Sequence, residues 1–442
     1  MKKLLALLLA LLMVLSLAAC AAEEEEDTGS RRKKKDTETT SDTTEVTEAE
    51  EEEEEEEEKE DKKDKKSPYT IFEELDVEIL DIDEATISIS EFEPDRYGDP
   101  TAIIEVKNHT NEEMHVYPDA VAINGKIVSE YFSVTVDAKD TATYEFTIYD
   151  AFEDPDDLTR LTMSVNVLDE DYSGESYLID IYPQGLDAYE ENAPKRSGDV
   201  LLDKKDVYVA ANKITYPSNY NPEVHYVAFN DADEVYELSI DTLAINEFGI
   251  EDYHSTTLLP DTYAEHYFEL YSHEQLVQLG MKANELTSIT INTTIWDEEY
   301  STVAENETTI YPGGKDNAEE FVYSPDKNDV VVVETDDFRL LQVSTTTDSW
   351  NDVDVLFVVE NKSGKTLTIS GSEAKLNGKD ADLYFYCNAV DGRNTFEVLY
   401  VYASDLEEVN ASKVSSLEML LEVYDENYKD IYEGTVKFNV TE

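Results

Sequence analysis

Apolar and polar residues alternate along three stretches of the chain that share the same landmarks. A strand-like run that ends in asparagine occurs at 102–108, 224–230 and 355–361. Apolar pairs follow six and eight residues after that asparagine, and a second asparagine follows after sixteen. Alternation with a period of two is typical of strands that bury one face. The pattern therefore predicts one set of strands, repeated three times.

The second half of each stretch repeats as well. Alternating runs at 161–167, 289–295 and 417–423 each lead into an acidic turn that ends in tyrosine. The spacing between the two halves varies, as expected for loops that connect fixed strands.

Each repeat spans about 115 residues, at 69–183, 199–312 and 328–442, and contains about seven expected strands. Short antiparallel strands in this number predict an all-β fold of three tandem immunoglobulin-like sandwiches. A small barrel is the alternative topology. The Asn-Gly pairs at 124–125 and 377–378 favour tight hairpins. Residues 273–279 have a helical pattern, and 404–408 fit a single helical turn.

The third repeat contains Glu360-Asn361-Lys362-Ser363, then Asn377-Gly378, then an Asp-x-x-Tyr turn at 425–428. This series resembles the immunoglobulin-like repeats of surface lipoproteins from low-GC Gram-positive bacteria. The resemblance covers nearly all of 70–442. It implies an architecture, but a fold by itself does not imply an activity.

The first twenty residues have the three-part layout of a secretory signal: Met1-Lys2-Lys3, an apolar run over 4–17, and Ala18-Ala19-Cys20. The apolar run is too short for a comfortable permanent membrane span. The end of the segment resembles a bacterial lipobox. The resemblance implies a signal peptide at 1–19, cleavage between Ala19 and Cys20, and lipidation of Cys20. An ordinary secretory signal with a chance cysteine is the alternative.

Residues 20–68 are predicted to be a disordered, charged tether. No aromatic residue occurs there, and an unbroken acidic run covers 50–58. Such a composition buries too little apolar surface to offset the loss of chain entropy. The tether is expected to act as a spacer that holds the repeats away from the membrane; alternatively, its two basic patches contact anionic headgroups.

The formal net charge of −69, most of it on the repeats, limits the classes of partner. A field of this sign repels nucleic acid and anionic polymers and favours basic or cation-bridged partners. Tyrosine is abundant, with 29 residues against 14 phenylalanines. The tyrosines either occupy ordinary strand positions, which favour this residue, or form a recognition surface.

Fragments of catalytic motifs occur in the sequence without the other residues that each motif requires. His273-Glu274 begins a zinc motif, but Val277 stands where the second histidine is required. Ser372 and Lys375 match S-x-x-K on an expected strand, without the partner motifs. Cys387 is the only cysteine besides Cys20 and is expected to be a small buried hydrophobe. We therefore expect neither enzymatic activity nor a cofactor.

The acidic turns are the one repeated polar feature. Carboxylates at a hairpin, together with backbone carbonyls and water, suit Ca²⁺. The candidate ligands are Asp169, Asp171, Asp297, Glu299 and Asp425. The alternative is a solvated turn with its tyrosine packed underneath.

The sequence thus predicts a lipid-anchored protein on the extracytoplasmic face of the cell membrane, whose repeats bind a protein or a glycan without catalysis. A passive spacer or envelope-assembly component is the alternative. A Ca²⁺-binding or enzymatic accessory protein is a weaker one.

Overall fold

The computed structural model describes residues 77–94, 100–148, 158–182, 189, 192–217, 221–282, 286–317 and 321–440. The chain divides into two units, Met1–Lys65 and Lys66–Glu442. The predicted signal peptide, Cys20 with its cleavage site after Ala19, and the tether up to residue 68 all lie outside the described residues.

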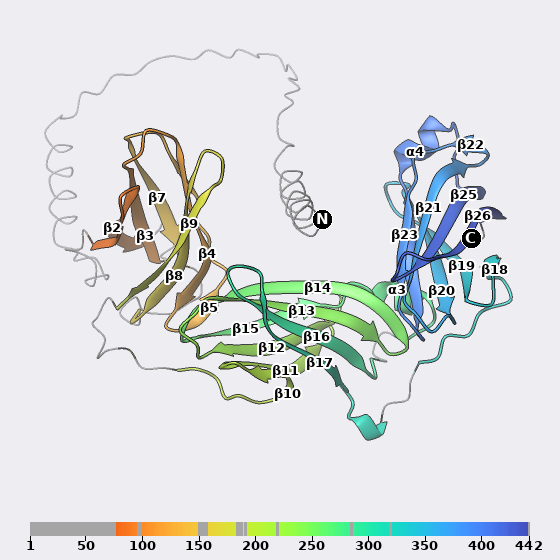
Figure 1. Ribbon diagram of the computed structural model, residues 1–442, viewed down its shortest axis with the longest axis horizontal. Coiled ribbons are helices and arrows are strands. Elements are labelled where there is room, and N and C mark those ends of the chain that lie inside the picture. Colours follow the sequence, from red (N-terminus) through yellow and green to blue (C-terminus); the bar gives the residue numbers. More distant parts are fainter. Residues whose placement is uncertain are drawn as a thin grey trace, which may run out of the picture. The chain divides into compact units, whose positions relative to one another are not determined.

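The described strands pair antiparallel with two exceptions and form four sheets, so the all-β prediction is confirmed (Figure 1). None of these sheets closes on itself, which excludes the alternative barrel topology for the described strands. Three main clusters of buried apolar side chains lie in successive parts of the chain. That each cluster corresponds to one immunoglobulin-like domain with the bounds 69–183, 199–312 and 328–442 stays a prediction.

The first cluster lies between a four-stranded sheet and part of a nine-stranded sheet, and includes Ile104, Val116 and Met163. The four-stranded sheet contains β1 (Val77–Asp81), β2 (Ala85–Pro94), β3 (Pro100–Asn108) and β7 (Thr141–Thr147). The strands on the other side are β4 (Met114–Ile123), β5 (Lys126–Val128), β6 (Val134–Val136), β8 (Leu161–Asp169) and β9 (Gly174–Ile181).

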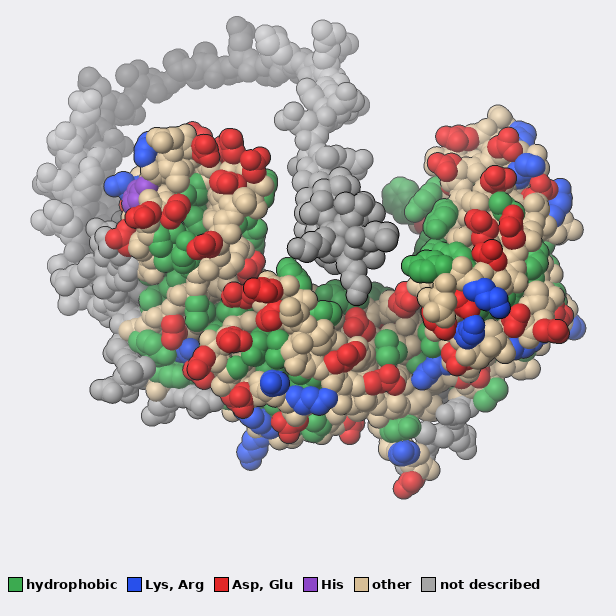
Figure 2. Space-filling model, viewed as in Figure 1, with side chains coloured by type: hydrophobic (Ala, Val, Ile, Leu, Met, Phe, Trp, Pro, Cys, Tyr) green, Lys and Arg blue, Asp and Glu red, His purple; other side chains and the backbone are tan. Residues whose placement is uncertain are grey.

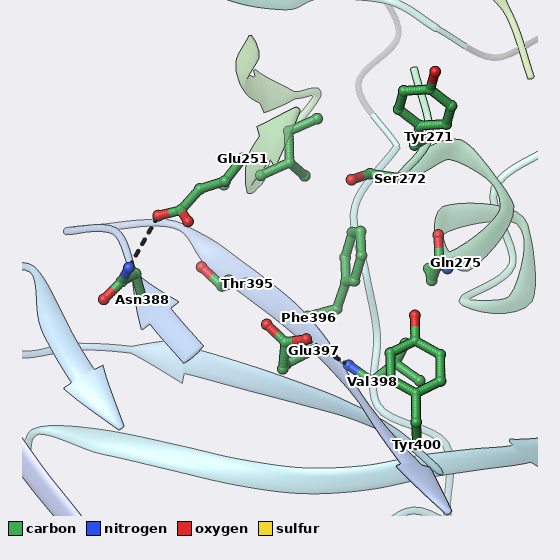
Figure 3. A pocket seen from close by; sticks show the side chains of 12 residues that line it. Glu251, Tyr271, Ser272, Gln275, Asn388, Thr395, Phe396, Glu397, Val398 and Tyr400 are labelled. Atoms are coloured by element: carbon green, nitrogen blue, oxygen red, sulfur yellow. Dashed lines mark hydrogen bonds between the residues drawn. The ribbon is translucent and has the colours of Figure 1, made fainter. Parts of the chain in front are cut away.

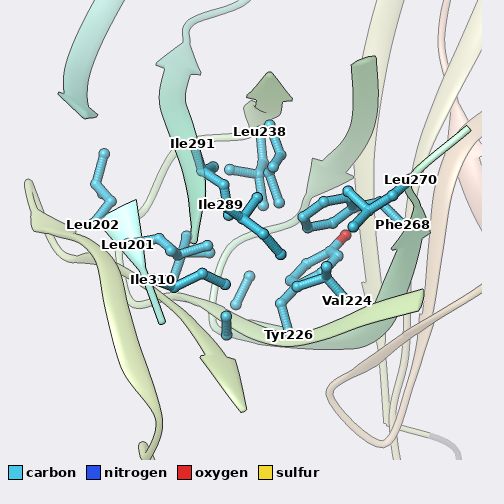
Figure 4. Packing of buried hydrophobic residues seen from close by; sticks show 14 of the residues in the cluster. Leu201, Leu202, Val224, Tyr226, Leu238, Phe268, Leu270, Ile289, Ile291 and Ile310 are labelled. Atoms are coloured by element: carbon cyan, nitrogen blue, oxygen red, sulfur yellow. The ribbon is translucent and has the colours of Figure 1, made fainter. Parts of the chain in front are cut away.

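The second cluster contains Tyr226, Phe268 and Ile289, which Figure 4 shows packed among aliphatic side chains. One side is formed by β10 (Asp199–Lys204), β11 (Val207–Thr215), β12 (Glu223–Asn230) and β15 (Thr262–Glu269). The other side is formed by β13 (Tyr236–Ile245), β14 (Phe248–Leu258), β16 (Ile289–Trp296) and β17 (Thr302–Ile310).

The third cluster contains Phe357, Cys387 and Leu421. Its strands in the eight-stranded sheet are β18 (Val330–Glu334), β19 (Phe338–Thr347), β20 (Val353–Asn361) and β24 (Asn394–Val401). The five-stranded sheet contains β21 (Leu367–Leu376), β22 (Lys379–Asp380), β23 (Phe385–Ala389), β25 (Ser416–Asp425) and β26 (Asp430–Asn439).

Two parallel pairings extend the sheets across the predicted repeat boundaries. Lys126 of β5 pairs with Tyr263 of β15, and Gly249 of β14 pairs with Thr395 of β24. Apolar periodicity within one repeat contains no information about these contacts, and the sequence did not predict them.

The period-two pattern corresponds to strands that bury every second side chain, as predicted. In β25, Leu417, Met419, Leu421 and Val423 are buried, and the residues between them are at least partly exposed. Complete burial of each such side chain stabilises the fold by roughly 1.5–3 kcal/mol. A shift of one residue would place this whole set on the solvent side, so the burial sets the register.

The first landmark asparagine of each repeat is buried at the end of a central strand. In Asn108, Asn230 and Asn361, Nδ2 donates to the carbonyl oxygens four and 28 residues further along, at 2.7–3.1 Å. Each Oδ1 accepts the backbone N–H two residues ahead, at 2.7–3.0 Å. One side chain thus joins the strand end, the following loop and a returning strand.

The second landmark asparagine sits in a hairpin with left-handed backbone geometry. The φ angles of Asn124, Asn246 and Asn377 are 51°, 52° and 54°. Gly125 and Gly378 follow at 83° and 82°, so the two predicted Asn-Gly hairpins are confirmed. Each asparagine Oδ1 accepts two backbone N–H groups from the segment before the next strand, at 2.7–3.2 Å.

Both predicted helical segments are present, as α3 (His273–Gln278) and α4 (Ala403–Glu408), and a 3-10 turn, η4, covers Lys315–Asn317. The chain reverses its direction after α3 at Gly280, whose φ is 98°. Within the described residues, no helix has the length and apolar character that a membrane span requires.

We expect Asn361→Ala to lower the free energy of unfolding of the residues around the third cluster by about 2–4 kcal/mol, because it leaves buried backbone groups without partners. Urea denaturation followed by circular dichroism measures the loss. Asn439→Ala, on an exposed strand position, is the matched control. An Asn361→Ala variant as stable as the parent would contradict this role.

Candidate functional site

The acidic turns are held by their first aspartate. Oδ1 of this residue accepts the backbone N–H groups two and four positions ahead, at 2.8–3.1 Å, in all three turns. These aspartates are Asp169, Asp297 and Asp425. The carboxylate therefore replaces a backbone acceptor inside the turn, as aspartate does in Asx turns.

The other calcium candidates, Asp171 and Glu299, are exposed. Oδ2 of the buried Asp425 accepts a hydrogen bond of 2.5 Å from Nζ of Lys365, which lowers the pKa of that carboxyl group. The described residues contain no group of three or more His, Cys, Asp or Glu side chains that would hold a metal ion. Calcium binding at these turns stays a hypothesis, and the calorimetry described below tests it.

The tyrosines of the turns do not pack underneath, so that expectation is wrong. Tyr172, Tyr300 and Tyr428 are 67%, 79% and 83% exposed. Each adopts a positive φ of 56–59°, so the turn carries the ring at its outer corner. In a fourth turn, which the sequence did not reveal, Oδ1 of Asp348 accepts the backbone N–H groups two and four positions ahead in the same way, and Trp350 is 78% exposed.

The residues singled out in the motif fragments are ion-paired or buried. Lys375 lies on the outer face of β21, as expected, and its Nζ donates to Glu418 at 2.9 Å. His273 is buried at the start of α3. Cys387 is 1% exposed, and burial raises the pKa of its thiol, which therefore stays protonated, as predicted for a small buried hydrophobe.

A pocket of about 310 Å³ lies where β14 runs beside β24 (Figure 3). Its walls come from β14, from α3 and the segment leading into it, from β23 and from β24. The lining residues are Gly249, Ile250, Glu251, Tyr271, Ser272, Gln275, Asn388, Thr395, Phe396, Glu397, Val398 and Tyr400. None of these twelve is Lys, Arg or His, so the pocket is acidic and aromatic.

Gly249 allows the two strands to approach closely. A Cβ atom at this position would lie 3.1 Å from Cγ2 of Val390 and 3.3 Å from Oγ1 of Thr395. Both distances are shorter than ordinary van der Waals contact. The absence of a side chain at Gly249 thus places Glu251 of β14 next to the side chains of β24.

Thr395 has an unused hydrogen-bonding group in the pocket wall. The residue is 6% exposed, and its Oγ1 has no hydrogen-bond partner among the described residues. An unsatisfied buried polar group of this kind costs about 1–3 kcal/mol. Figure 3 draws Thr395 in the wall together with Glu251 and Glu397.

The two carboxylates have only neutral partners. Glu251 accepts a 3.2 Å hydrogen bond from Asn388, and Glu397 accepts one of 3.1 Å from the N–H of Val398. Neither forms an ion pair with a described Lys or Arg. Burial, with a contribution from the charge of Glu251, raises the pKa of Glu397 to about 7.

Aromatic residues also line the pocket. Tyr271 and Tyr400 are 59% and 51% exposed, and Phe396 packs on Phe248 of the second cluster with ring centroids 5.9 Å apart. Ser272 donates to Asp252 at 3.0 Å, which fixes the start of α3 relative to β14.

A second acidic pocket, of about 350 Å³, includes Asp119, Glu237 and Tyr300. Burial raises the pKa of both carboxyl groups. Asn166 donates to Asp119 at 2.6 Å and Thr257 donates to Glu237 at 3.0 Å. The calcium candidate Asp297 also lines this pocket. Across the described surface, acidic side chains outnumber basic ones on the face that Figure 2 shows.

Two histidines that are distant in the sequence meet beside the second cluster. The rings of His254 and His266 have centroids 5.4 Å apart, and Nε2 of His254 lies 2.9 Å from the hydroxyl of Tyr226. Burial lowers the pKa of His254 to about 4, so it is neutral at physiological pH. The six histidines show no ligand spacing in the sequence, and this pair comes from two different strands, β14 and β15.

No family model matches the chain, and no curated protein matches it. Among solved structures, a bacterial ice-binding adhesin is 14% identical over 77% of this chain and 90% of its own, with a TM-score of 0.15. The transglutaminase of red sea bream is 10% identical, with a TM-score of 0.16, and the chain covers 37% of it. The trypsin-activated alpha-2-macroglobulin of Escherichia coli is 10% identical, with a TM-score of 0.14, and the chain covers 24% of it. These scores carry no argument about function.

We expect neither excess EDTA nor millimolar Ca²⁺ to shift the midpoint of thermal unfolding by more than about 1 °C, because the first aspartate of each turn already accepts two backbone N–H groups. Differential scanning calorimetry of the full chain measures the shift. A Ca²⁺-dependent rise that Asp297→Asn removes would instead establish a calcium site.

We expect Glu397→Gln to raise the unfolding midpoint at about pH 8 and to have less effect at about pH 5. The pKa of Glu397 is raised in the folded state, so its carboxylic acid is tolerated there, and stability falls as the pH rises from the unfolded pKa towards 7. Thermal melts over this pH range measure the difference. Glu422→Gln, on an exposed position of β25, is the control. A gain that does not depend on pH would contradict the explanation.

Proposed function

We propose that the protein is a lipid-anchored, extracytoplasmic binding protein that acts without catalysis of its own. The signal-like segment that ends at Cys20 supports export and anchoring, and the charged composition of 20–68 supports a tether. Both lie outside the described residues, so this half of the proposal depends on the sequence alone.

The binding half of the proposal depends on one observation. The pocket between β14 and β24 contains the buried, unpartnered Thr395 Oγ1 and two carboxylates without a cationic partner. The unpartnered hydroxyl of Thr395 and the partly buried carboxylate of Glu397 are destabilising unless another molecule satisfies them. Exposed Tyr271 and Tyr400 add rigid amphipathic surface at the mouth. Such a combination of apolar walls and a few convergent polar groups is typical of ligand sites.

A passive spacer is the second candidate, and a specific contact favours it. Arg160, 4% exposed, forms an ion pair with Asp180 at 2.8 Å and donates to the carbonyl oxygen of Asp261 at 2.8 Å. Together with the β5–β15 pairing, this contact links the strands of the first and second clusters. A spacer must keep a fixed distance between its two ends, and links between neighbouring parts of the chain serve that purpose.

We expect cells that express the full chain to incorporate an alkyne-tagged fatty acid into it, because the thioether-linked cysteine is the acylated position in the family it resembles. Cys20→Ala should lose the label and appear in the medium. Cys387→Ala is the matched control and should keep the label, since its thiol is buried. A labelled Cys20→Ala variant would contradict the anchor.

The purified full chain, screened against arrays of glycans and extracellular proteins, tests binding. A saturable hit at micromolar concentration supports the binding protein. The absence of any hit favours the spacer.

A further inference from the structure

We propose that the pocket between β14 and β24 binds a protonated primary amine at the end of an unbranched alkyl chain, as in a lysine side chain. The inference rests on the proposed binding function and names the class of ligand. It follows from the three polar groups that the pocket presents and from the character of its walls.

The polar groups match the donors of an ammonium group. An ammonium group has three N–H donors and no acceptor. Glu251 and Glu397 supply carboxylate oxygens that have no described cationic partner, and Thr395 supplies a buried hydroxyl oxygen that accepts no other hydrogen bond. A neutral hydroxyl group of a ligand would leave the partial burial of the Glu397 carboxylate uncompensated, whereas a cation offsets it and is also attracted by the exposed Glu251.

The walls match the carbon stem of such a ligand. Phe396 and Val398 of β24 present apolar surface, and the rings of Tyr271 and Tyr400 stand at the mouth. Alkyl chains of lysine cover apolar surface while their charged end stays with polar groups. A divalent metal ion fits less well, since the described residues provide no group of three ligating side chains.

The negative charge of the chain favours the same ligand. With a net charge of −69, the protein attracts cations over a distance and repels anions. The pocket itself contains no Lys, Arg or His that would compete for the two carboxylates. An amine-bearing ligand therefore meets a favourable potential both outside and inside the pocket.

Calorimetric titration of the full chain with Nα-acetyl-lysine N-methylamide tests the proposal. We expect saturable binding that Glu251→Gln and Glu397→Gln each weaken at least about fivefold and Thr395→Val weakens about threefold or more. Glu422→Gln is the matched control and should bind like the parent. The Nε-acetylated form of the same probe, which has no charge, should not bind to the parent.

The alternatives give different results. Equal binding of the Nε-acetylated probe, or unchanged binding by all three pocket variants, would overturn the proposal. Binding of glucosamine in place of the lysine probe would overturn the assignment of an unbranched chain. If the arrays yield a ligand and the lysine probe does not bind, this inference fails while the binding function stands; if neither binds, both fail. Thermal melts of the variants show that they are folded, so that the loss of binding is interpretable.

Discussion

Buried backbone groups must find hydrogen-bond partners, and in this protein three asparagines meet that constraint where the strands end. Asn108, Asn230 and Asn361 each connect a central strand to the following loop and to a returning strand. Asn230 donates to the carbonyl of Leu258 at the end of β14, and Asn361 donates to that of Ala389 at the end of β23. Two of the elements that form the candidate pocket are therefore held in place by this interaction.

The same requirement explains the connections across the predicted repeat boundaries. The edges of β5 and β14 would expose free N–H and C=O groups, and edge strands of this kind invite pairing with other chains. Here they pair with β15 and β24 of the same chain. Arg160 adds hydrogen bonds to the carbonyl oxygens of Pro260 and Asp261. Part of the polar edge of each strand is thus paired within the molecule.

The sequence predicted those features that depend on local pattern. Alternation located the strands, and repeated spacing picked out Asn108 and Asn124 together with their equivalents, because each makes hydrogen bonds that every repeat needs. The tyrosines of the acidic turns were assigned wrongly, since the left-handed backbone that points them outward leaves no trace in periodicity. The pocket was not predicted at all. Its residues come from Gly249 to Tyr400 and meet through a parallel pairing that no repeat contains by itself.

The electrostatics of the pocket link stability to binding. A pKa of about 7 for Glu397, against about 4.5 for an ordinary glutamate, means that its carboxylate is destabilised in the fold by on the order of 3 kcal/mol. A partly buried position under no other requirement would accommodate Gln or Leu at less cost, and the buried Thr395 hydroxyl adds to the same deficit. Residues that destabilise the folded state and converge on one cavity are typical of functional sites, where stability is exchanged for affinity. Because burial strengthens any charge interaction that forms there, the groups that destabilise the empty pocket are the ones that would hold a cation most strongly.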